Sequence, residues 1–461
     1  MTEQAFVLMP AFGPAIATGL ALAALVFFCQ SVIYPLLLSP LRHVPGPKLA
    51  AITSFYLDSR YCIDTAVPFI KALHQKYGPV VRVGPNEVVT NDPKHLALVY
   101  GPRSPFRKPD TAVLNHNHGY PNTFSAITRE EHKQTRRQVA KVYTMSSILK
   151  NDALTAWIHD RLSTSSSIIE RNNGAPVDIF ALAGYFALDV VSFLVYGRSF
   201  NLLEGNNLHI ADNIRVTASI SVPVVRFFWL FKYFGVWPLT YLLPNIYNMG
   251  ATAAASLEAA NLAQLNAVNN AQRRPDPDKT AVGCMQDQPS YGKSLTDGHV
   301  KSECLDHIVA GADTTAASMT YLLYTLARPE NQKHQDRLRE EVSKLALPLD
   351  FKEVCNLPFL NTCVLECLRL YPPGPGGLQQ RVAPAGETTV LVSHGKSYGL
   401  PPNTMVGAQA YSLQRNEGIY GARSDEFLPE RWELASETQL QTMKDAWIVF
   451  GSGARTCIGI K

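Results

Sequence analysis

Residues 450–459 read FGSGARTCIG and surround a single cysteine, Cys457, with glycines. Glycine lacks a Cβ, so the backbone of such a turn can approach a sulfur atom closely. N–H groups that point at a cysteine thiolate stabilise its negative charge. The alternative without a metal site is a glycine-rich loop with one buried cysteine. The glycines at 451, 453 and 459, together with Arg455, favour a thiolate turn that binds a metal.

A thiolate held in this way can ligate the iron of a porphyrin. The two propionates of a porphyrin need cationic partners, and Arg455 can answer one of them with a bidentate hydrogen bond. Phe450 is then expected to close the turn against the edge of the ring. These residues together predict a site for iron porphyrin with Cys457 as the axial ligand.

The segment resembles the haem-binding loop of the cytochrome P-450 superfamily, whose haem is ligated by cysteine. The resemblance implies haem b (iron protoporphyrin IX) and a mainly α fold with small β-sheets, a triangular helical domain plus a small β domain. The resemblance extends from residue 42 to the last residue. The sequence of Tyr77–Val88 resembles that of membrane-anchored fungal members of the family that act in specialised metabolism.

A pair of opposite charges lies upstream, in VLECLRLYPP at 364–373. Glu366 and Arg369 are three residues apart and share one face of a helix that the prolines end. Such pairs are commonly solvated surface contacts, but the leucines around this pair favour burial. By resemblance, Arg431 in PERW at 429–432 completes a network with Glu366 and Arg369 on the proximal side of the haem.

The segment IVAGADTTAAS at 308–318 resembles the oxygen-activating helix of the family. A glycine inside a helix costs about 1 kcal/mol relative to alanine, and room for dioxygen would explain Gly311. Thr314 is then a hydroxyl that assists oxygen activation, while Asp313 relays protons from solvent. The alternative is that Thr314 only bonds back to the preceding turn and Asp313 is exposed.

Three further basic residues are expected at the haem propionates. His132 and Arg136 are four residues apart on one helical face and resemble the W-x-x-x-R element of the family, with histidine in the tryptophan position. Arg381 stands where the family places a strand residue that meets a propionate. The alternative for the basic helix is a solvated surface.

Composition agrees with one large catalytic domain. The chain has 461 residues, of which 46% are hydrophobic and 17% charged, enough to bury a large core. The net charge of +4 is too slight to imply a nucleic-acid partner. The eight cysteines do not form a disulfide ladder and suit a reducing compartment.

The N-terminus predicts a membrane anchor. No charged residue occurs from Gln4 to Leu41, and a helix over about 15–34 would span about 30 Å, the thickness of a bilayer core. We therefore expect an anchor at 1–41, a proline-rich hinge at 42–48 and the catalytic domain at 49–461. Arg42 and Lys48 place that domain in the cytosol by the positive-inside rule, on the endoplasmic reticulum membrane as a single-pass protein. A cleaved secretory signal is the alternative.

The remaining pattern predicts a small β-sheet over 77–88, helices from about 128 to 272, and short strands near 387–393 and 404–411. The polar stretch 273–292, with prolines at 275, 277 and 289, predicts a mobile surface loop. In the family a helix follows the cysteine loop, whereas Gly459 is followed here by two residues. We therefore expect an incomplete gene model or a truncated, catalytically silent haem-binding paralogue as the alternative to an active enzyme.

The resemblance implies a monooxygenase that oxidises, most simply by hydroxylation, a lipophilic small molecule. Its electrons would come from a membrane-bound NADPH-dependent flavoprotein reductase. By position, the loop Phe106–Phe124, the helix before Ala310 and Gly376–Gln380 line the pocket. Two other classes remain open, a haem protein without turnover and a membrane-anchored interaction protein without haem. A carbon monoxide difference spectrum of the reduced protein distinguishes them.

Overall fold

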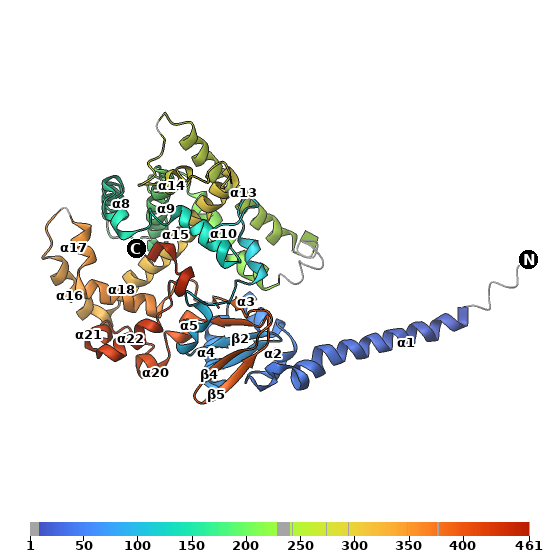
Figure 1. Cartoon of the computed structure of the whole chain (residues 1–461). Coiled ribbons are helices and arrows are strands. Elements are labelled where there is room, and N and C mark those ends of the chain that lie inside the picture. The colour runs from blue at the N-terminus through green and yellow to red at the C-terminus, as the bar shows by residue number, and fades with distance from the viewer. Residues whose placement is uncertain are drawn as a thin grey trace, which may run out of the picture.

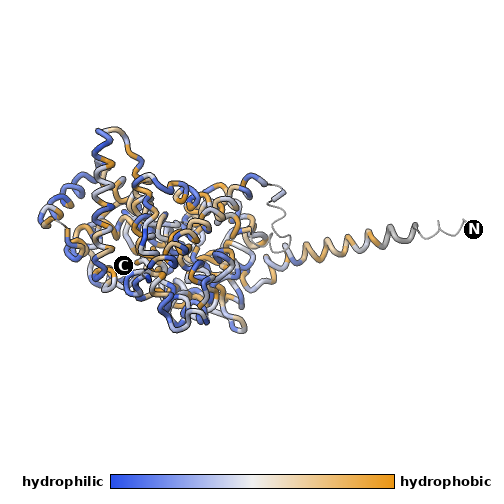
Figure 2. The backbone as a smooth tube through the Cα atoms, turned by 90° about the horizontal axis from the view of Figure 1, so that it is seen from above, coloured by the Kyte–Doolittle hydropathy of each residue, from blue (hydrophilic) through white to orange (hydrophobic). Residues whose placement is uncertain are grey.

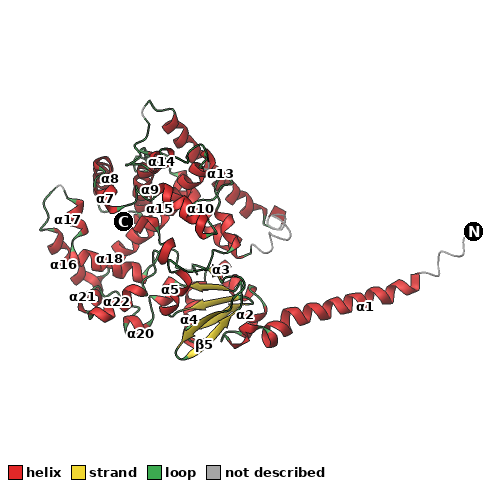
Figure 3. Ribbon diagram, in the orientation of Figure 1, coloured by secondary structure: helices red, strands yellow, loops and turns green. Residues whose placement is uncertain are grey.

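The computed structural model describes residues 9–227, 240–241, 243–272, 274–293, 295–347, 349–375 and 378–460. A large helical body lies beside a smaller part that contains the strands, and one long helix projects from the latter (Figures 1 and 3). The prediction of a mainly α chain with small β-sheets is thus confirmed. Parts of the sequence predictions lie outside the described residues: 1–8 of the anchor, 228–239 and 242 of the helical stretch, Arg273, Gly376, Gly377 and Lys461.

The projecting helix is apolar along its whole described length. Helix α1 (Met9–Phe28) continues as the π-helix η1 (Cys29–Leu38), and Figure 2 shows it away from the body in mostly hydrophobic colours. The window Ile16–Leu38 has 23 residues, a mean hydropathy of 2.2 and no buried share, so it fits a membrane anchor. Helix α9 (Ile179–Tyr196) is similarly apolar, but half of it is buried inside the body, as expected of a core helix.

The strands form one sheet and one hairpin. The sheet has the order β1-β2-β6-β3, built from β1 (Val80–Gly84), β2 (Glu87–Thr90), β6 (Met405–Ala408) and β3 (Arg381–Val382). β1 and β2 pair antiparallel, whereas β2 and β6 run parallel with Val88 opposite Val406. The hairpin joins β4 (Thr389–Ser393) to β5 (Lys396–Leu400). All residues of β1 and β2 are buried, which explains their valine-rich sequence.

The segment predicted as a hinge is docked on the sheet. The backbone N–H of Arg82 in β1 donates to the carbonyl of Pro45 at 2.7 Å, and its side chain donates to the carbonyl of Pro35 in η1 at 2.8 Å. A Cβ at Gly46 would overlap the carbonyl oxygen of Arg82, so only glycine permits this approach. The buried Leu41 adds apolar contact. The N-terminal helix is therefore attached to the sheet through close backbone packing.

Helices surround the sheet and build the body. The long helix α15 (Asp297–Ala327) runs through the centre of the body. The other helices of eight or more residues are α3 (Phe55–Cys62), α4 (Ala66–Tyr77), α6 (Arg129–Val139), α8 (Asp152–Arg171), α10 (His209–Arg226), α13 (Pro244–Asn269), α16 (Gln332–Val342), α18 (Pro358–Leu370) and α22 (Glu437–Asp445). The shorter helices are α2 (Lys48–Ile52), α5 (Lys94–Tyr100), η2 (Pro40–His43), η3 (Asp110–Asn115), α7 (Met145–Leu149), α14 (Ala281–Gln286), η4 (Pro329–Asn331), α17 (Phe351–Cys355), α19 (Ala410–Leu413), α20 (Glu417–Tyr420), α21 (Glu430–Leu434), η5 (Gly453–Arg455) and η6 (Ile458–Ile460).

Gly311 has a packing role that the sequence did not predict. A Cβ at Gly311 would lie 2.8 Å from Cγ2 of Val191 on α9, so this glycine allows α15 and α9 to pack closely. Ala310 and Thr314 are exposed, whereas Gly311 is half-buried. The expectation that Gly311 makes room for dioxygen stays a prediction, because this contact concerns only the side of α15 that meets α9. Helix packing in the core requires the small residue.

The prediction of a mobile loop over 273–292 is wrong for residues 281–286. Helix α14 lies within it, and Ala281, Val282 and Met285 are completely buried in the main core. Thr280 caps the helix by accepting a hydrogen bond from the N–H of Gly283 at 3.1 Å. The prolines that suggested a loop flank this helix and do not enter it. A short apolar run between them has the hydrophobic driving force to pack into the core.

Candidate active site

The loop around Cys457 is a tight turn with two left-handed glycines. Gly451 has φ +75° and Gly453 has φ +71°, and the N–H of Cys457 donates to the carbonyl of Phe450 at 2.7 Å. A Cβ at Gly453 would overlap the carbonyl oxygen of Tyr100 at the end of α5, so the turn also needs glycine for close approach. The Cys457 side chain is exposed. The turn thus presents a thiol on the open side of the loop.

Opposing influences act on the thiol. Although the residue is exposed, neighbouring groups partly desolvate its sulfur, and the pKa of Cys457 is raised overall. The charge of Asp306 adds to this rise, while the backbone N–H of Gly459 and the charge of Arg136 oppose it. The hydrogen bond from Gly459 and the positive charge of Arg136 stabilise the thiolate form. A cationic ligand such as a metal would favour the thiolate further.

Five basic side chains gather next to this turn, and we call them the basic cluster: Lys108, His132, Arg136, Arg381 and Arg455. Burial, followed by the charges of Arg455, Arg136, Lys108 and Arg381, lowers the pKa of His132 to about 3. Burial, Arg381 and Arg455 lower the pKa of Lys108 to about 7. Within the described residues, none of the five forms an ion pair with a carboxylate. The cluster therefore holds an excess of positive charge.

Backbone carbonyls satisfy part of the cluster. Arg455 donates to the carbonyls of residues 126, 127 and 128 at 2.6, 2.9 and 2.8 Å. Arg136 donates to the carbonyl of Thr456 at 2.5 Å, and Arg381 to the carbonyls of Gln379 and Gln380. Carbonyl dipoles do not neutralise these charges, and buried charge without a counter-ion is unfavourable.

This donor set fits haem. A planar group with two carboxylates would supply the missing negative charge, and Cys457 offers a thiolate for its iron beside the same cations. The structure thus brings Cys457, Arg455, His132, Arg136 and Arg381 together, as the sequence predicted. Phe450 lies at the base of the turn, where its ring is 5.6 Å from that of Trp447.

Lys108 was missed by the sequence analysis. It lies in an irregular segment between α5 and η3, where no helical spacing or motif marks it. Its ammonium group donates to the carbonyl of Phe124 and lies 3.9 Å from the centre of the Phe124 ring. Only the folding of this segment against the loop before α6 reveals that it belongs to the basic cluster.

Glu366 is the centre of a buried network on α18. Arg369 donates two hydrogen bonds to its carboxylate, both at 2.8 Å, and Arg431 donates one at 2.9 Å. The indole N–H of Trp432 and the backbone N–H of Leu428 add bonds of 2.9 and 3.0 Å. Glu366 and Arg369 are completely buried. Burial alone would raise the pKa of Glu366, but Arg369 and Arg431 bring it below its usual value.

On α15, Ala310 and Thr314 expose one stretch of the helix. The hydroxyl of Thr314 donates to the carbonyl of Ala310 at 2.8 Å, so its hydrogen is bonded back to the preceding turn while the side chain remains exposed. Asp313 is half-buried. Burial raises its pKa, and the charge of Arg215 on α10 opposes this shift. An acid that holds a proton more tightly than usual thus lies next to an exposed hydroxyl.

The helical body, the small sheet and the exposed thiol beside a basic cluster define a protein of the haem-thiolate class. The sequence profile of the family "Cytochrome P-450" matches residues 59–461. The chain belongs to the cytochrome P-450 family, whose members are haem-containing monooxygenases that incorporate oxygen.

Curated relatives carry the same family name. The chain is 29% identical to a cytochrome P-450 monooxygenase of Aspergillus terreus, over 91% of this chain and 86% of the relative. It is 28% identical to the monooxygenase gsfF of Penicillium aethiopicum, over 93% and 85%, and 28% identical to the monooxygenase orf2 of Aspergillus niger, over 97% and 88%. These relatives come from fungi, in agreement with the resemblance noted in the sequence.

Proposed function

We propose that the chain is a haem b monooxygenase that oxidises a lipophilic small molecule in fungal secondary metabolite biosynthesis, most simply by hydroxylation. The observation that carries the proposal is the basic cluster, which forms no ion pair with a carboxylate of the described residues, beside the exposed thiol of Cys457. Haem held by a thiolate supplies the activation of molecular oxygen once two electrons are delivered. As members of this family receive their electrons from redox partners, we propose a membrane-bound NADPH-dependent flavoprotein reductase as the electron source.

Each site residue has a defined task in this proposal. Cys457 Sγ ligates the iron, and Phe450 packs at the base of the ligand turn. The basic cluster pairs with the propionates, which removes the mutual repulsion of its members. The Glu366 network holds α18 and the segment after it in place beneath the site. These tasks require positions that stay fixed when substrate binds, and the buried hydrogen bonds around Glu366 provide such rigidity.

Asp313 and Thr314 handle protons. Burial raises the pKa of Asp313, so its carboxyl holds a proton more tightly than an exposed acid does, which supports a role as a proton donor. The Thr314 hydroxyl can exchange its bond to Ala310 for one to a reacting group on the exposed side of α15. Val113, Leu114 and Phe124 are exposed on the loop that we predicted to line the pocket, which supports a lipophilic substrate.

The apolar N-terminal helix supports a place at a membrane. We propose that it anchors the protein in the endoplasmic reticulum membrane, with Arg42 and Lys48 holding the catalytic domain on the cytosolic side. A substrate that partitions into lipid would then reach the site from the bilayer. A protease-protection assay on microsomes tests this orientation: protection of the catalytic domain from added protease would refute it.

A carbon monoxide difference spectrum tests the ligand assignment. We expect the reduced protein to give the Soret band of thiolate-ligated haem, and Cys457→Ser to lose it. Cys355→Ser is the matched control, because Cys355 is also exposed but lies in the short helix α17. A thiolate band that persists in Cys457→Ser would show that another residue ligates the iron. A thiolate band without product in the presence of reductase and NADPH would favour a silent haem-binding protein.

A further inference from the structure

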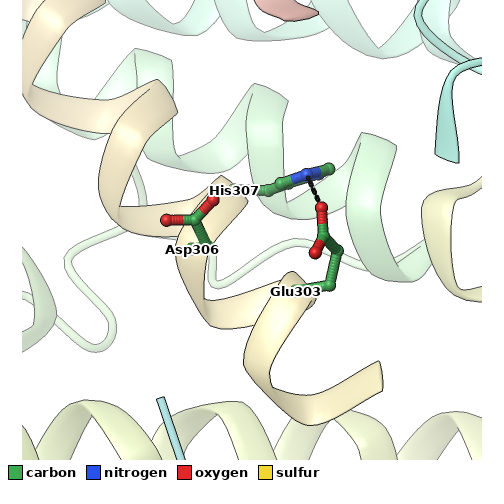
Figure 4. Close-up of side chains that lie close together, drawn as sticks. All are labelled: Glu303, Asp306 and His307. Atoms are coloured by element: carbon green, nitrogen blue, oxygen red, sulfur yellow. Dashed lines mark hydrogen bonds and ion pairs between the residues drawn. The ribbon is translucent and has the colours of Figure 1, made fainter. Parts of the chain in front are cut away.

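A second buried charge pair lies on α15, one turn before the exposed stretch of the candidate site. Glu303 and His307 are 2% and 6% exposed, and His307 Nε2 lies 3.1 Å from Glu303 Oε1. Figure 4 shows the two side chains meeting, with Asp306 beside them on the same helix. Burying such a pair is costly unless further hydrogen bonds satisfy it. Its presence in a core helix therefore needs a reason.

Helical spacing places this pair on the stripe that faces the site. Glu303, His307, Ala310 and Thr314 follow the spacing i, i+4, i+7, i+11, so their side chains leave α15 on one side. Ala310 and Thr314 are exposed, whereas Glu303 and His307 are covered by other parts of the chain. The pair thus lies where the covered part of the stripe meets the open part.

Two separate segments cover the pair, and each is bonded to one member of it. The backbone N–H of Thr123 donates to Glu303 Oε2 at 2.8 Å. The Tyr143 hydroxyl, in the turn after α6, lies 2.6 Å from His307 Nδ1. Ser302 supports the first contact, since its hydroxyl donates to the carbonyl of Tyr120 at 2.7 Å. α15 therefore holds the loop before α6 through Glu303 and the turn after α6 through His307.

These two segments carry much of the basic cluster. The loop 122–128 supplies the carbonyls that bind Arg455 and the carbonyl of Phe124 that accepts from Lys108. Helix α6, which lies between Thr123 and Tyr143, carries His132 and Arg136. Fixing both ends of this stretch fixes the cations with respect to α15.

We propose that Glu303 and His307 are positioning residues. They hold the loop 117–128 and helix α6 in a fixed position relative to the Ala310–Thr314 stretch of α15. This inference rests on the proposed function, because the loop with helix α6 and the Ala310–Thr314 stretch are the two sides of the proposed haem site. Neither residue touches the reacting atoms in this role. The Glu303 carboxylate holds the backbone N–H of Thr123, and the His307 ring holds the hydroxyl of Tyr143.

The protonation of His307 gives the arrangement a pH dependence. The titratable groups that face it are Glu303 and Asp306 on its own helix and Tyr143 from the turn after α6. Burial alone would lower the pKa of His307, but the hydrogen bond and charge of Glu303 and the charge of Asp306 raise it. Stabilisation by a raised histidine pKa is complete below its unfolded value near 6.5 and is lost as pH rises through the folded value.

Amide hydrogen exchange on the haem-loaded full chain tests the proposal. In Glu303→Gln we expect exchange in 117–128 to accelerate about tenfold or more, because a charge-assisted hydrogen bond to a backbone N–H is weakened. In Tyr143→Phe we expect acceleration around 140–146 but not in 117–128. Exchange in α18 should remain unchanged in both. Glu340→Gln is the matched control, since Glu340 is exposed and pairs only with Lys344 at 3.3 Å.

Haem release to an acceptor globin, measured as a function of pH, distinguishes residues that position the haem site from residues that only contribute to overall stability. We expect the release rate of the unmodified protein to rise between pH 6 and pH 9, and the rate of His307→Gln to be higher at pH 6 and less dependent on pH. Unchanged exchange in 117–128 of Glu303→Gln, or equal acceleration throughout the chain, would overturn the proposal. If the thiolate band is present while exchange is unchanged, only the positioning inference fails. If the exchange changes as expected but the band is absent, the haem assignment fails instead.

Discussion

Replacing Lys108 with methionine tests whether the basic cluster is built for an anionic ligand. The Lys108 ammonium group has a backbone carbonyl and an aromatic ring as partners. Burial and the charges of Arg381 and Arg455 lower the pKa of Lys108 from 10.5 to about 7. Methionine fills a similar volume without a charge. We therefore expect Lys108→Met to stabilise the haem-free chain and to weaken haem binding.

The size of the effect follows from the pKa of Lys108. The drop from 10.5 to about 7 corresponds to about 5 kcal/mol between the charged and neutral forms. Lys108 is only half-buried, so solvent screening reduces this to about 2 kcal/mol. A lowered lysine pKa costs stability that builds up as pH falls from the unfolded value of about 10.4 and is complete below the folded value of about 7. The advantage of the variant should therefore be largest at pH 6 and shrink as pH rises toward 9.

Urea unfolding of the haem-free chain at several pH values measures this difference, and titration with haem measures affinity. We expect haem affinity to fall about tenfold or more in Lys108→Met, since a charge-assisted contact is lost. Lys133→Met is the control, because Lys133 is exposed on α6 near the same cluster. The reasoning is refuted if Lys108→Met destabilises the haem-free chain at pH 6, or if its haem affinity is unchanged.

Three other substitutions give expected outcomes. Glu366→Gln should lower the free energy of unfolding by about 3–5 kcal/mol in urea melts, because buried arginines lose their counter-charge, whereas the exposed Glu426→Gln should cost little. Gly453→Ala should shift or abolish the thiolate Soret band through its overlap with a backbone carbonyl; Gly395→Ala, at a similar φ of +75° but in open space, should keep the band, and equal spectra for both would contradict the geometry. Thr314→Ala should retain the band but form less product per NADPH consumed, and unchanged coupling would argue against a role in proton delivery.

Local sequence was sufficient where the chemistry depends on local geometry. The glycines around Cys457 encode the positive φ values and the close approach that the turn requires. The i, i+3 spacing of Glu366 and Arg369 encodes their mutual hydrogen bonds on α18. In both cases the determining residues are neighbours in the chain, so a pattern of a few letters carries the structural information.

Sequence was insufficient where the role of a residue comes from distant partners. Lys108 acquires its role from Phe124 and the other cations, and no periodic pattern marks it. Gly311 allows close packing against Val191 on another helix, a contact that its own sequence neighbours do not reveal. The Glu303–His307 pair was overlooked because its partners are a backbone amide and a tyrosine from other segments. Such roles become visible only once tertiary packing is known.

The contact between Gly46 and Arg82 bears on how the protein would sit in a lipid bilayer. Because the backbone at Gly46 packs on the sheet without room for a side chain, the segment after η1 is not a flexible linker. Any tilt of the N-terminal helix in the lipid is then transmitted to the sheet. With the helix in a membrane, this contact, the Arg82–Pro35 hydrogen bond and the buried Leu41 would together restrict the angles open to the rest of the chain, and a larger residue at position 46 would weaken that restriction.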